Sequence, residues 1–213
     1  MPAAIILAAG DSTRIGTPKA LLADPDGRPF VARIVRAFVA AGIGDVVIVT
    51  GAQHDAIHGA IQSAIHSAIS TDQPSIPPRL VRNPDPARGP LSSLWVGLDA
   101  VMRPDLDAIL MTLVDVPMVS ATTIRAVIDA WTRTGAPVVR PAMGPRHGHP
   151  VLFDRAVFAE LRNAPLEQGA KAVVHAHADH LVNVEVSDEG CLMDIDTAAD
   201  YESALERMAK KSY

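Results

Sequence analysis

Short apolar runs alternate along the chain with segments whose apolar residues recur at helical spacing, and this alternation limits the possible folds most. Residues 3–7, 46–49 and 108–113 are apolar runs of strand length. Between them, apolar residues recur at helical spacing over residues 30–39, and isoleucines recur every fourth residue from Ile57 to Ile69. Repeated strand–helix–strand units predict an α/β fold with a mostly parallel sheet and right-handed crossovers.

The remaining elements continue the same pattern. We expect further strands at residues 80–81, 138–139 and 181–186, and further helices at residues 92–101, 120–131, 152–161, 170–178 and 198–208. Aromatic residues make up only 4% of the chain, so Val, Ile, Leu and Ala must build the core. That mixture suits a parallel sheet covered by helices.

Charge and cysteine content exclude several classes of protein. The formal net charge of −5 argues against a non-specific nucleic-acid partner or a membrane-surface partner. No run of about 18 apolar residues predicts a membrane span. Cys191 is the single cysteine, which excludes an internal disulfide and a Cys-rich zinc site. We therefore expect a cytoplasmic protein in a reducing compartment.

The loop after the first predicted strand has the properties of a phosphate-binding loop. Gly10 and Gly16 allow close backbone approach to a ligand, and successive backbone N–H groups in such a loop can surround an anion. Arg14 and Lys19 add two cations that suit the polyphosphate of a nucleoside triphosphate (NTP). The candidate nucleotide-binding residues of this loop are Leu7, Ala8, Ala9, Gly10, Gly16 and Lys19.

Two better-known phosphate loops do not match. A Walker A loop places Lys directly after its second glycine, whereas Lys19 stands three residues after Gly16. The G-x-G-x-x-G pattern of dinucleotide-binding proteins is also missing between Gly10 and Gly16, which disfavours a dinucleotide-dependent oxidoreductase.

Three aspartates are candidate metal ligands or helix-capping residues. Asp115 follows the predicted strand at residues 108–113, and ligands in such folds bind beyond the carboxyl ends of the strands. A carboxylate there suits Mg²⁺, but Asp115 could equally belong to a turn or cap a helix. Asp194 and Asp196 are two residues apart and would face the same side of an extended segment. Their positions alone do not say which of the two is the ligand.

Several segments together resemble the molybdopterin nucleotidyltransferases, a family of NTP transferases. Residues 7–19 are similar to its L-A-(A/G)-G-x-S-x-R-x-G-x-x-K signature, and residues 83–98 to its second nucleotide-contacting loop. Residues 113–117 resemble its metal-binding strand end, and residues 148–153 the acceptor-side segment of its cytidylyl branch. Residues 194–201 resemble its closing D-I-D-T-P-E-D-(L/Y) motif, except that Ala198 and Ala199 replace Pro and Glu.

The resemblance implies one NTP transferase domain over residues 1–213, with a Rossmann-like three-layer α/β/α fold of the nucleotide-diphospho-sugar transferase type. Its N-terminal part would bind the nucleotide and its C-terminal part the acceptor. Mg²⁺ would be the cofactor, held by Asp115 and Asp194, and the catalytic residues would be Lys19, Arg14 and Asp115. The second nucleotide loop would contribute Asn83, Gly89, Ser92 and Ser93, and the acceptor site His149, Gly169 and Lys171.

The activity that the resemblance implies is transfer of CMP from CTP to a phosphorylated acceptor, with release of pyrophosphate. The acceptor would be molybdopterin, and a molybdoenzyme could receive the product. Ala9 is typical of the cytidylyl branch, whereas Gly89-Pro90-Leu91 resembles the guanylyl branch, so GTP remains an alternative. Glu167 and Lys171 depart from the family's G-D-x-G-A-R segment and leave another phosphorylated acceptor open. A non-enzymatic nucleotide-binding protein is the remaining alternative.

Overall fold

The structure is a computed structural model that describes residues 1–10, 15–68 and 77–210. Arg14, a predicted catalytic residue, lies outside the described residues. In the described part of the chain, no helix is both long enough and apolar enough to cross a membrane.

An eight-stranded mixed sheet forms the centre of the described part of the molecule, with the strand order β3-β2-β1-β4-β7-β5-β6 and β8 paired with β5. Parallel pairings join β1 to β2 and β4, β2 to β3, and β5 to β8. Antiparallel pairings join β7 to β4 and β5, and β6 to β5. The strands are β1 (Ala3–Ala8), β2 (Val46–Thr50), β3 (Arg79–Arg82), β4 (Ala108–Leu113), β5 (Val138–Met143), β6 (Arg146–His147), β7 (Val151–Asp154) and β8 (Val182–Glu185).

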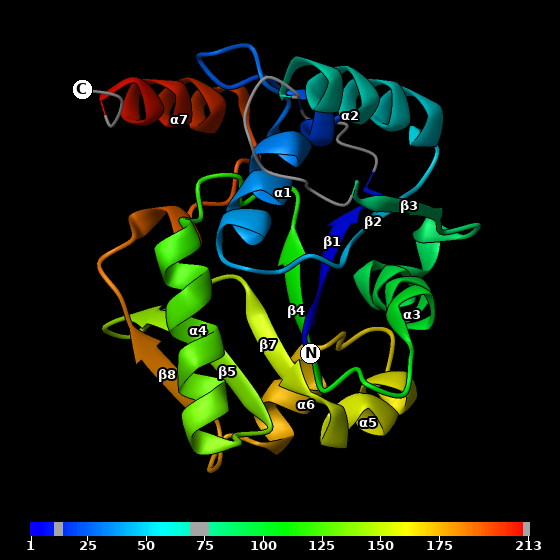
Figure 1. Cartoon of the computed structure of the whole chain (residues 1–213), viewed down its shortest axis with the longest axis vertical. Coiled ribbons are helices and arrows are strands. Elements are labelled where there is room, and N and C mark those ends of the chain that lie inside the picture. The colour runs from blue at the N-terminus through cyan, green and yellow to red at the C-terminus, as the bar shows by residue number, and fades with distance from the viewer. Residues whose placement is uncertain (11–14, 69–76, 211–213) are drawn as a thin grey trace.

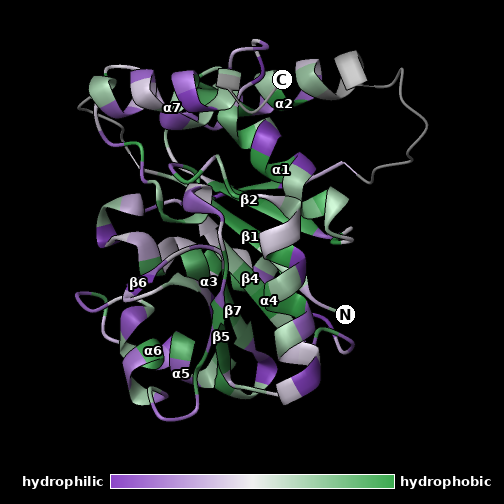
Figure 2. Cartoon of the chain, turned by 90° about the vertical axis from the view of Figure 1, so that its left-hand side faces the viewer, coloured by the Kyte–Doolittle hydropathy of each residue, from purple (hydrophilic) through white to green (hydrophobic). Residues whose placement is uncertain are grey.

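Seven α-helices of the described residues cover the sheet (Figure 1). They are α1 (Phe30–Ala40), α2 (His54–Ala68), α3 (Pro90–Val101), α4 (Ala121–Thr134), α5 (Phe158–Asn163), α6 (Lys171–Ala176) and α7 (Ala198–Lys210). Helices α1 and α4 lie on one side of the sheet and α3, α5 and α6 on the other (Figure 2). The expected α/β, three-layer Rossmann-like architecture is therefore confirmed.

Both faces of the sheet are buried, because the side chains of each central strand alternate between two apolar cores. In β1, Ile6 packs in the core shared with α1, α2 and α4, whereas Ile5 packs in the core shared with α3, α5 and α6. Figure 2 shows the strands as the most hydrophobic layer of the chain. Such continuous apolar strands are typical of a sheet covered on both sides.

Local sequence signals explain where several helices begin and end. The Ser120 hydroxyl accepts the Thr123 N–H at 3.1 Å and so caps α4, and Gly135 ends the same helix in the left-handed conformation at φ 63°. Helix α7 covers the edge of the core through Ala204 and Met208, which pack with Phe30 and Ile195.

The helix expected at residues 152–161 is wrong in its first half. Val151–Asp154 forms strand β7, and only Phe158–Asn163 is α-helical. Strand β7 runs antiparallel to both β4 and β5, so the C-terminal half of the sheet is mixed, whereas the pairings among β1, β2, β3 and β4 are parallel as expected. A four-residue apolar segment is compatible with a helix or with a buried strand. Here it forms a strand because β4 and β5 each have an edge with which it can pair.

Candidate active site

A pocket of about 300 Å³ opens where the carboxyl ends of β1 and β4 meet, with strand β2 ending beside β1. Parallel strands that end together leave their following loops side by side, and ligands bind in the crevice between them. The lining residues are Leu7, Ala9, Gly10, Lys19, Pro86, Gly89, Pro90, Ser93, Leu113, Val114, Asp115 and Asp196.

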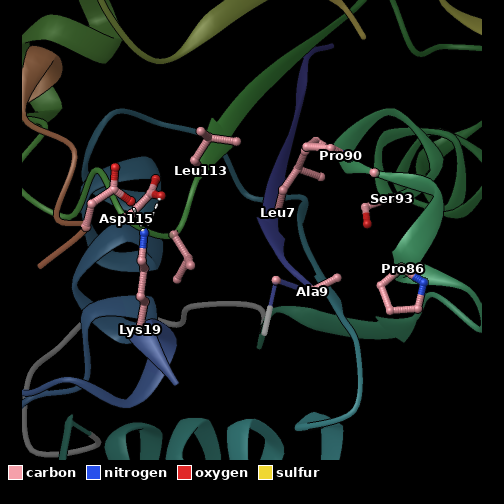
Figure 3. Close-up of a pocket in the computed structure, with 12 residues that line it drawn as sticks. Leu7, Ala9, Lys19, Pro86, Pro90, Ser93, Leu113 and Asp115 are labelled. Carbon is pink, nitrogen blue, oxygen red and sulfur yellow. Dashed lines mark hydrogen bonds and ion pairs between the residues drawn. The ribbon is translucent and has the colours of Figure 1, made fainter. Parts of the chain in front are cut away.

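One end of the pocket is charged and the other is not. Figure 3 shows Lys19 and Asp115 at one end, and Pro90 and Ser93 at the other. The apolar side chains of Leu7 and Leu113 lie between them. This polarity suits a ligand with a polyphosphate at one end and a planar ring at the other.

The charged end is built around the Lys19 ammonium group, whose Nζ lies 2.9 Å from Asp115 Oδ2 and 2.6 Å from Asp196 Oδ1. Burial by itself lowers the pKa of Lys19, but the hydrogen bonds to Asp196 and Asp115 outweigh it, so the pKa is raised above its usual value. Lys19 is therefore a fixed cation at neutral pH.

Asp194 belongs to the same charged cluster. Desolvation raises its pKa, and the negative charge of Asp115 adds to that rise, while His149 and Lys19 act in the opposite direction. The backbone connects the two aspartate segments, because the Ile195 N–H donates to the Asp115 carbonyl at 2.9 Å. Because the carboxylates of Asp115 and Asp194 repel each other, binding of a cation between them would be favourable.

The donor set at this position fits Mg²⁺ bound together with a substrate. Asp115 Oδ1 is buried and has no hydrogen-bond partner among the described residues, so it is available to a ligand. The described residues contain no group of three or more His, Cys, Asp or Glu side chains that could hold a metal ion by themselves. Mg²⁺ usually takes one or two carboxylates and completes its coordination with phosphates and water, which matches this site.

The uncharged end is formed by the loop before α3 and by the first turn of that helix. Gly89 has a φ of 93°, and Ser93 is only 3% exposed although it lines the pocket. Asn83 lies buried behind them and donates from Nδ2 to Ser92 Oγ at 2.9 Å and to Ser93 Oγ at 3.0 Å. Because the Ser93 oxygen accepts from Asn83, its own hydroxyl hydrogen can donate into the pocket.

The predicted acceptor residue His149 lies next to the aspartates. Burial lowers the pKa of its imidazole, so the ring is neutral at physiological pH. The negative charges of Asp194 and Asp115 act on this pKa in the opposite direction but do not outweigh burial. Its backbone N–H donates to the Cys191 carbonyl at 2.8 Å. The neighbouring Gly148 packs so tightly on Cys191 that a Cβ there would overlap that carbonyl, which joins the acceptor-side loop to the segment before α7.

Only some of the predicted residues line the pocket. Leu7, Ala9, Gly10, Lys19, Gly89, Ser93 and Asp115 line the pocket. Ala8 lines a small cavity beside it, Asn83 and Ser92 lie in the layer behind it, and Gly16, Gly169, Lys171, Asp194 and His149 are not among its lining residues. Lys171 is exposed at the start of α6 and adds a positive charge that acts on His149.

Four lining residues, Pro86, Pro90, Leu113 and Val114, lie within the segments predicted to form the site but were not predicted individually, and the pairing of Asp196 with Lys19 was not predicted. Pro90 stands directly after Gly89, and proline at the first helical position is a recognisable sign that α3 begins there. No local pattern indicates the Lys19–Asp196 pair, whose members are 177 residues apart in the chain.

The chain is similar to several known proteins. The chain is 44% identical over 55 residues to the bifunctional protein GlmU of Agrobacterium fabrum, a match that covers 25% of the chain but only 12% of that longer protein. It is 25% identical over 203 residues, or 95% of each chain, to the molybdenum cofactor cytidylyltransferase of Escherichia coli. The crystal structure of Rv0371c from Mycobacterium tuberculosis superposes with a TM-score of 0.77 at 26% identity, covering 96% of this chain and 97% of that one.

A second structure of Rv0371c, described as a complex with manganese, superposes with a TM-score of 0.71 at 24% identity and covers 96% of this chain and 98% of that one. The family profile described as the MobA-like NTP transferase domain matches residues 4–181, which is most of the sequence. Together with the strand order and the pocket at the ends of the parallel strands, this match identifies the chain as a member of the MobA-like NTP transferase family.

Proposed function

We propose that the chain transfers CMP from CTP to a phosphorylated acceptor, with molybdopterin as the acceptor, and releases pyrophosphate. The observation that supports this most directly is the two-ended pocket, in which Lys19 and Asp115 lie opposite Pro90 and Ser93. The similarity to a molybdenum cofactor cytidylyltransferase along 95% of the chain supports this acceptor and this nucleotide.

The reaction begins with an oxygen of the acceptor phosphate attacking the α-phosphorus of CTP. A new P–O bond forms, the bond between the α-phosphorus and its bridging oxygen to the β-phosphate breaks, and pyrophosphate leaves with that oxygen. The nucleophile is already anionic, so the protein needs no strong general base. This agrees with His149, because burial lowers the pKa of its imidazole and so makes it a weak base.

The charged end of the pocket stabilises the negative charge that develops in this step. Lys19 would donate to oxygens of the β- and γ-phosphates, in competition with its two aspartate partners. Asp115 and Asp194 would hold Mg²⁺, which when bound offsets charge on the phosphate oxygens. The Rv0371c structure with manganese supports a divalent cation in this family.

The uncharged end would select the base. Ala9 and Gly89 both line the pocket, and the Ser93 hydroxyl can donate to an oxygen or ring nitrogen of the base. A methyl group at position 9 leaves room for a pyrimidine and crowds a purine. CTP is therefore favoured over GTP.

The test is pyrophosphate release measured with each of the four NTPs and with a panel of phosphorylated acceptors that includes molybdopterin. The proposal expects turnover that needs both an NTP and an acceptor, with CTP and molybdopterin the best pair. A preference for GTP would replace the cytidylyl assignment with the guanylyl one. Nucleotide binding without turnover on any acceptor would support the non-enzymatic alternative.

A further inference from the structure

Gly51, the residue that follows strand β2, packs against the backbone of Ala9 in the nucleotide loop. A Cβ atom at position 51 would lie 2.7 Å from the Ala9 carbonyl oxygen and 3.3 Å from both its carbonyl carbon and its Cα. Both residues also line a small cavity next to the main pocket. The contact joins the end of β2 to the loop that follows β1.

Space, and not backbone conformation, makes glycine necessary at position 51. The positive-φ glycines of the described residues do not include Gly51, so its backbone conformation is open to any residue. The overlapping atoms all belong to the Ala9 backbone, which cannot rotate away as a flexible side chain can. An alanine at position 51 must therefore displace either the nucleotide loop or the end of β2.

The contact also fixes the direction of the next N–H group. The carbonyl of Ala9 faces Gly51, and the Ala9–Gly10 peptide is not among the cis bonds of the described chain. In a trans peptide the N–H points opposite to the carbonyl, so the Gly10 N–H points away from Gly51. Gly10 lines the main pocket, and its N–H donates no hydrogen bond to another described residue.

We propose that Gly51 is a positioning residue for nucleotide binding: by admitting the Ala9 carbonyl against its own Cα, it holds the Gly10 N–H toward an oxygen of the bound NTP. The proposal rests on the proposed function, because it needs an NTP in the main pocket. It assigns a role to a residue outside the nucleotide loop and outside the catalytic aspartates.

The test compares Gly51→Ala with Gly44→Ala, which is the same chemical change at a glycine whose Cβ would meet no atom within 4 Å. Isothermal titration with CTP and with GTP in the presence of Mg²⁺ gives the affinity of each folded variant. Loss of one hydrogen bond to a charged oxygen weakens binding about tenfold or more. We expect that loss for Gly51→Ala and an affinity equal to the parent's for Gly44→Ala.

A second variant separates positioning from general destabilisation. Glycine at position 9 gives the loop more backbone freedom, so Ala9→Gly should let the loop adapt to a Cβ at position 51. We expect Gly51→Ala to weaken NTP binding several-fold less in the Ala9→Gly background than in the parent. A purely structural defect at the end of β2 would cost the same affinity in both backgrounds.

The Gly10 amide resonance reports the same contact even if Gly51→Ala alone does not fold. In the parent, titration with Mg²⁺ and CTP should shift this resonance, Gly51→Ala should reduce that shift, and the combination with Ala9→Gly should restore part of it. A parent that binds neither CTP nor GTP contradicts the proposed function, and this inference with it. A parent that binds NTP without moving the Gly10 resonance, or a folded Gly51→Ala with the parent's affinity, contradicts the role of Gly51 alone.

Discussion

Lys19 Nζ lies 2.6 Å from Asp196 Oδ1, although the two residues are separated by 177 positions in the sequence. The ion pair joins the nucleotide loop after β1 to the segment before α7, and Asp115 completes it at 2.9 Å from the same ammonium group. The Lys19 side chain is only 14% exposed and that of Asp115 20%, so their contact is shielded from water more than an ordinary surface pair, whereas the Asp196 side chain is 49% exposed. The polyphosphate of a bound NTP must therefore compete with Asp115 and Asp196 for the Lys19 ammonium group.

Replacement of Lys19 by Ala is expected to weaken NTP binding about tenfold or more and to slow turnover, because a hydrogen-bonding cation at the phosphates is lost. Lys19→Arg should restore little of this, because the planar guanidinium places its charge differently from a compact ammonium. Isothermal titration with CTP and steady-state rates measure both effects. Unchanged affinity and unchanged rate in Lys19→Ala would return this residue to a structural ion pair.

The two neighbouring aspartates are expected to differ in what they control. Asp196 pairs with Lys19, whereas the pKa of Asp194 is raised mainly by desolvation and by the negative charge of Asp115. Asp194→Asn should therefore raise the Mg²⁺ concentration for half-maximal rate about tenfold or more, in line with loss of a metal ligand. Asp196→Asn should leave that concentration near the parent's and change the KM for NTP.

Rates measured against Mg²⁺ at saturating NTP, and against NTP at saturating Mg²⁺, separate the two roles. The assignment fails if Asp196→Asn, and not Asp194→Asn, is the variant that demands more Mg²⁺.

Ala9 is expected to set the choice between CTP and GTP. A pocket that discriminates by shape alone gives a preference of about 10–200-fold, so the parent should favour CTP within that range. Ala9→Gly should reduce the preference without producing a strict GTP enzyme. Competition between CTP and GTP on both proteins measures the ratio, and a parent that already prefers GTP would show the steric argument to be wrong.

Asp188 is expected to make the free energy of unfolding depend on pH in the acid range. Burial raises the pKa of this carboxyl, but the N–H groups of Ser120 at 2.8 Å and Gly190 at 3.1 Å and the Thr123 hydroxyl at 2.8 Å outweigh it, so the pKa is lowered. A carboxyl whose pKa is lower in the folded than in the unfolded protein stabilises the folded state at pH values above the unfolded pKa of about 3.9. This stabilisation is lost as the pH falls through the folded-state pKa. The interaction connects α4 to the segment that leads to Asp194.

Urea unfolding at pH 6 and at pH 3 measures this contribution. The parent should lose more free energy of unfolding between the two values than Asp188→Asn does. At pH 6 the substitution should cost about 1.5–3 kcal/mol, the range for hydrogen bonds to a charged group. An equal loss on acidification in both proteins would assign the acid sensitivity to other carboxyls.

The periodic parts of the chain could be predicted because local sequence determines them. The strand at residues 3–7, the helix at residues 30–39 and the Ser120 cap of α4 follow from patterns within a few residues of one another, and the structure contains all three. Strand β7 could not be predicted in this way. Val151, Leu152 and Phe153 form a strand because β4 and β5 both leave an edge open to it, and those partners lie in other parts of the chain.

The candidate site shows the same division. The loop residues Ala9, Gly10 and Lys19 were identified from one continuous motif, and all three line the pocket. Position in the sequence could not predict which of Asp194 and Asp196 pairs with Lys19, because two residues at alternate positions of an extended segment face the same side. The contact of Gly51 with Ala9 depends on the parallel pairing of β1 and β2, which no local pattern specifies.

The most direct test of the central proposal follows the labelled phosphorus atoms of CTP in the presence of Mg²⁺ and molybdopterin. With CTP labelled at the α-phosphate, the parent should transfer the label to the acceptor, and with CTP labelled at the γ-phosphate it should release the label as pyrophosphate. Asp115→Ala should keep the fold by circular dichroism but transfer label at least about 100-fold more slowly, because loss of a metal ligand removes several kcal/mol of transition-state stabilisation. Release of γ-label as inorganic phosphate, with no α-label on any phosphorylated acceptor, would contradict nucleotidyl transfer.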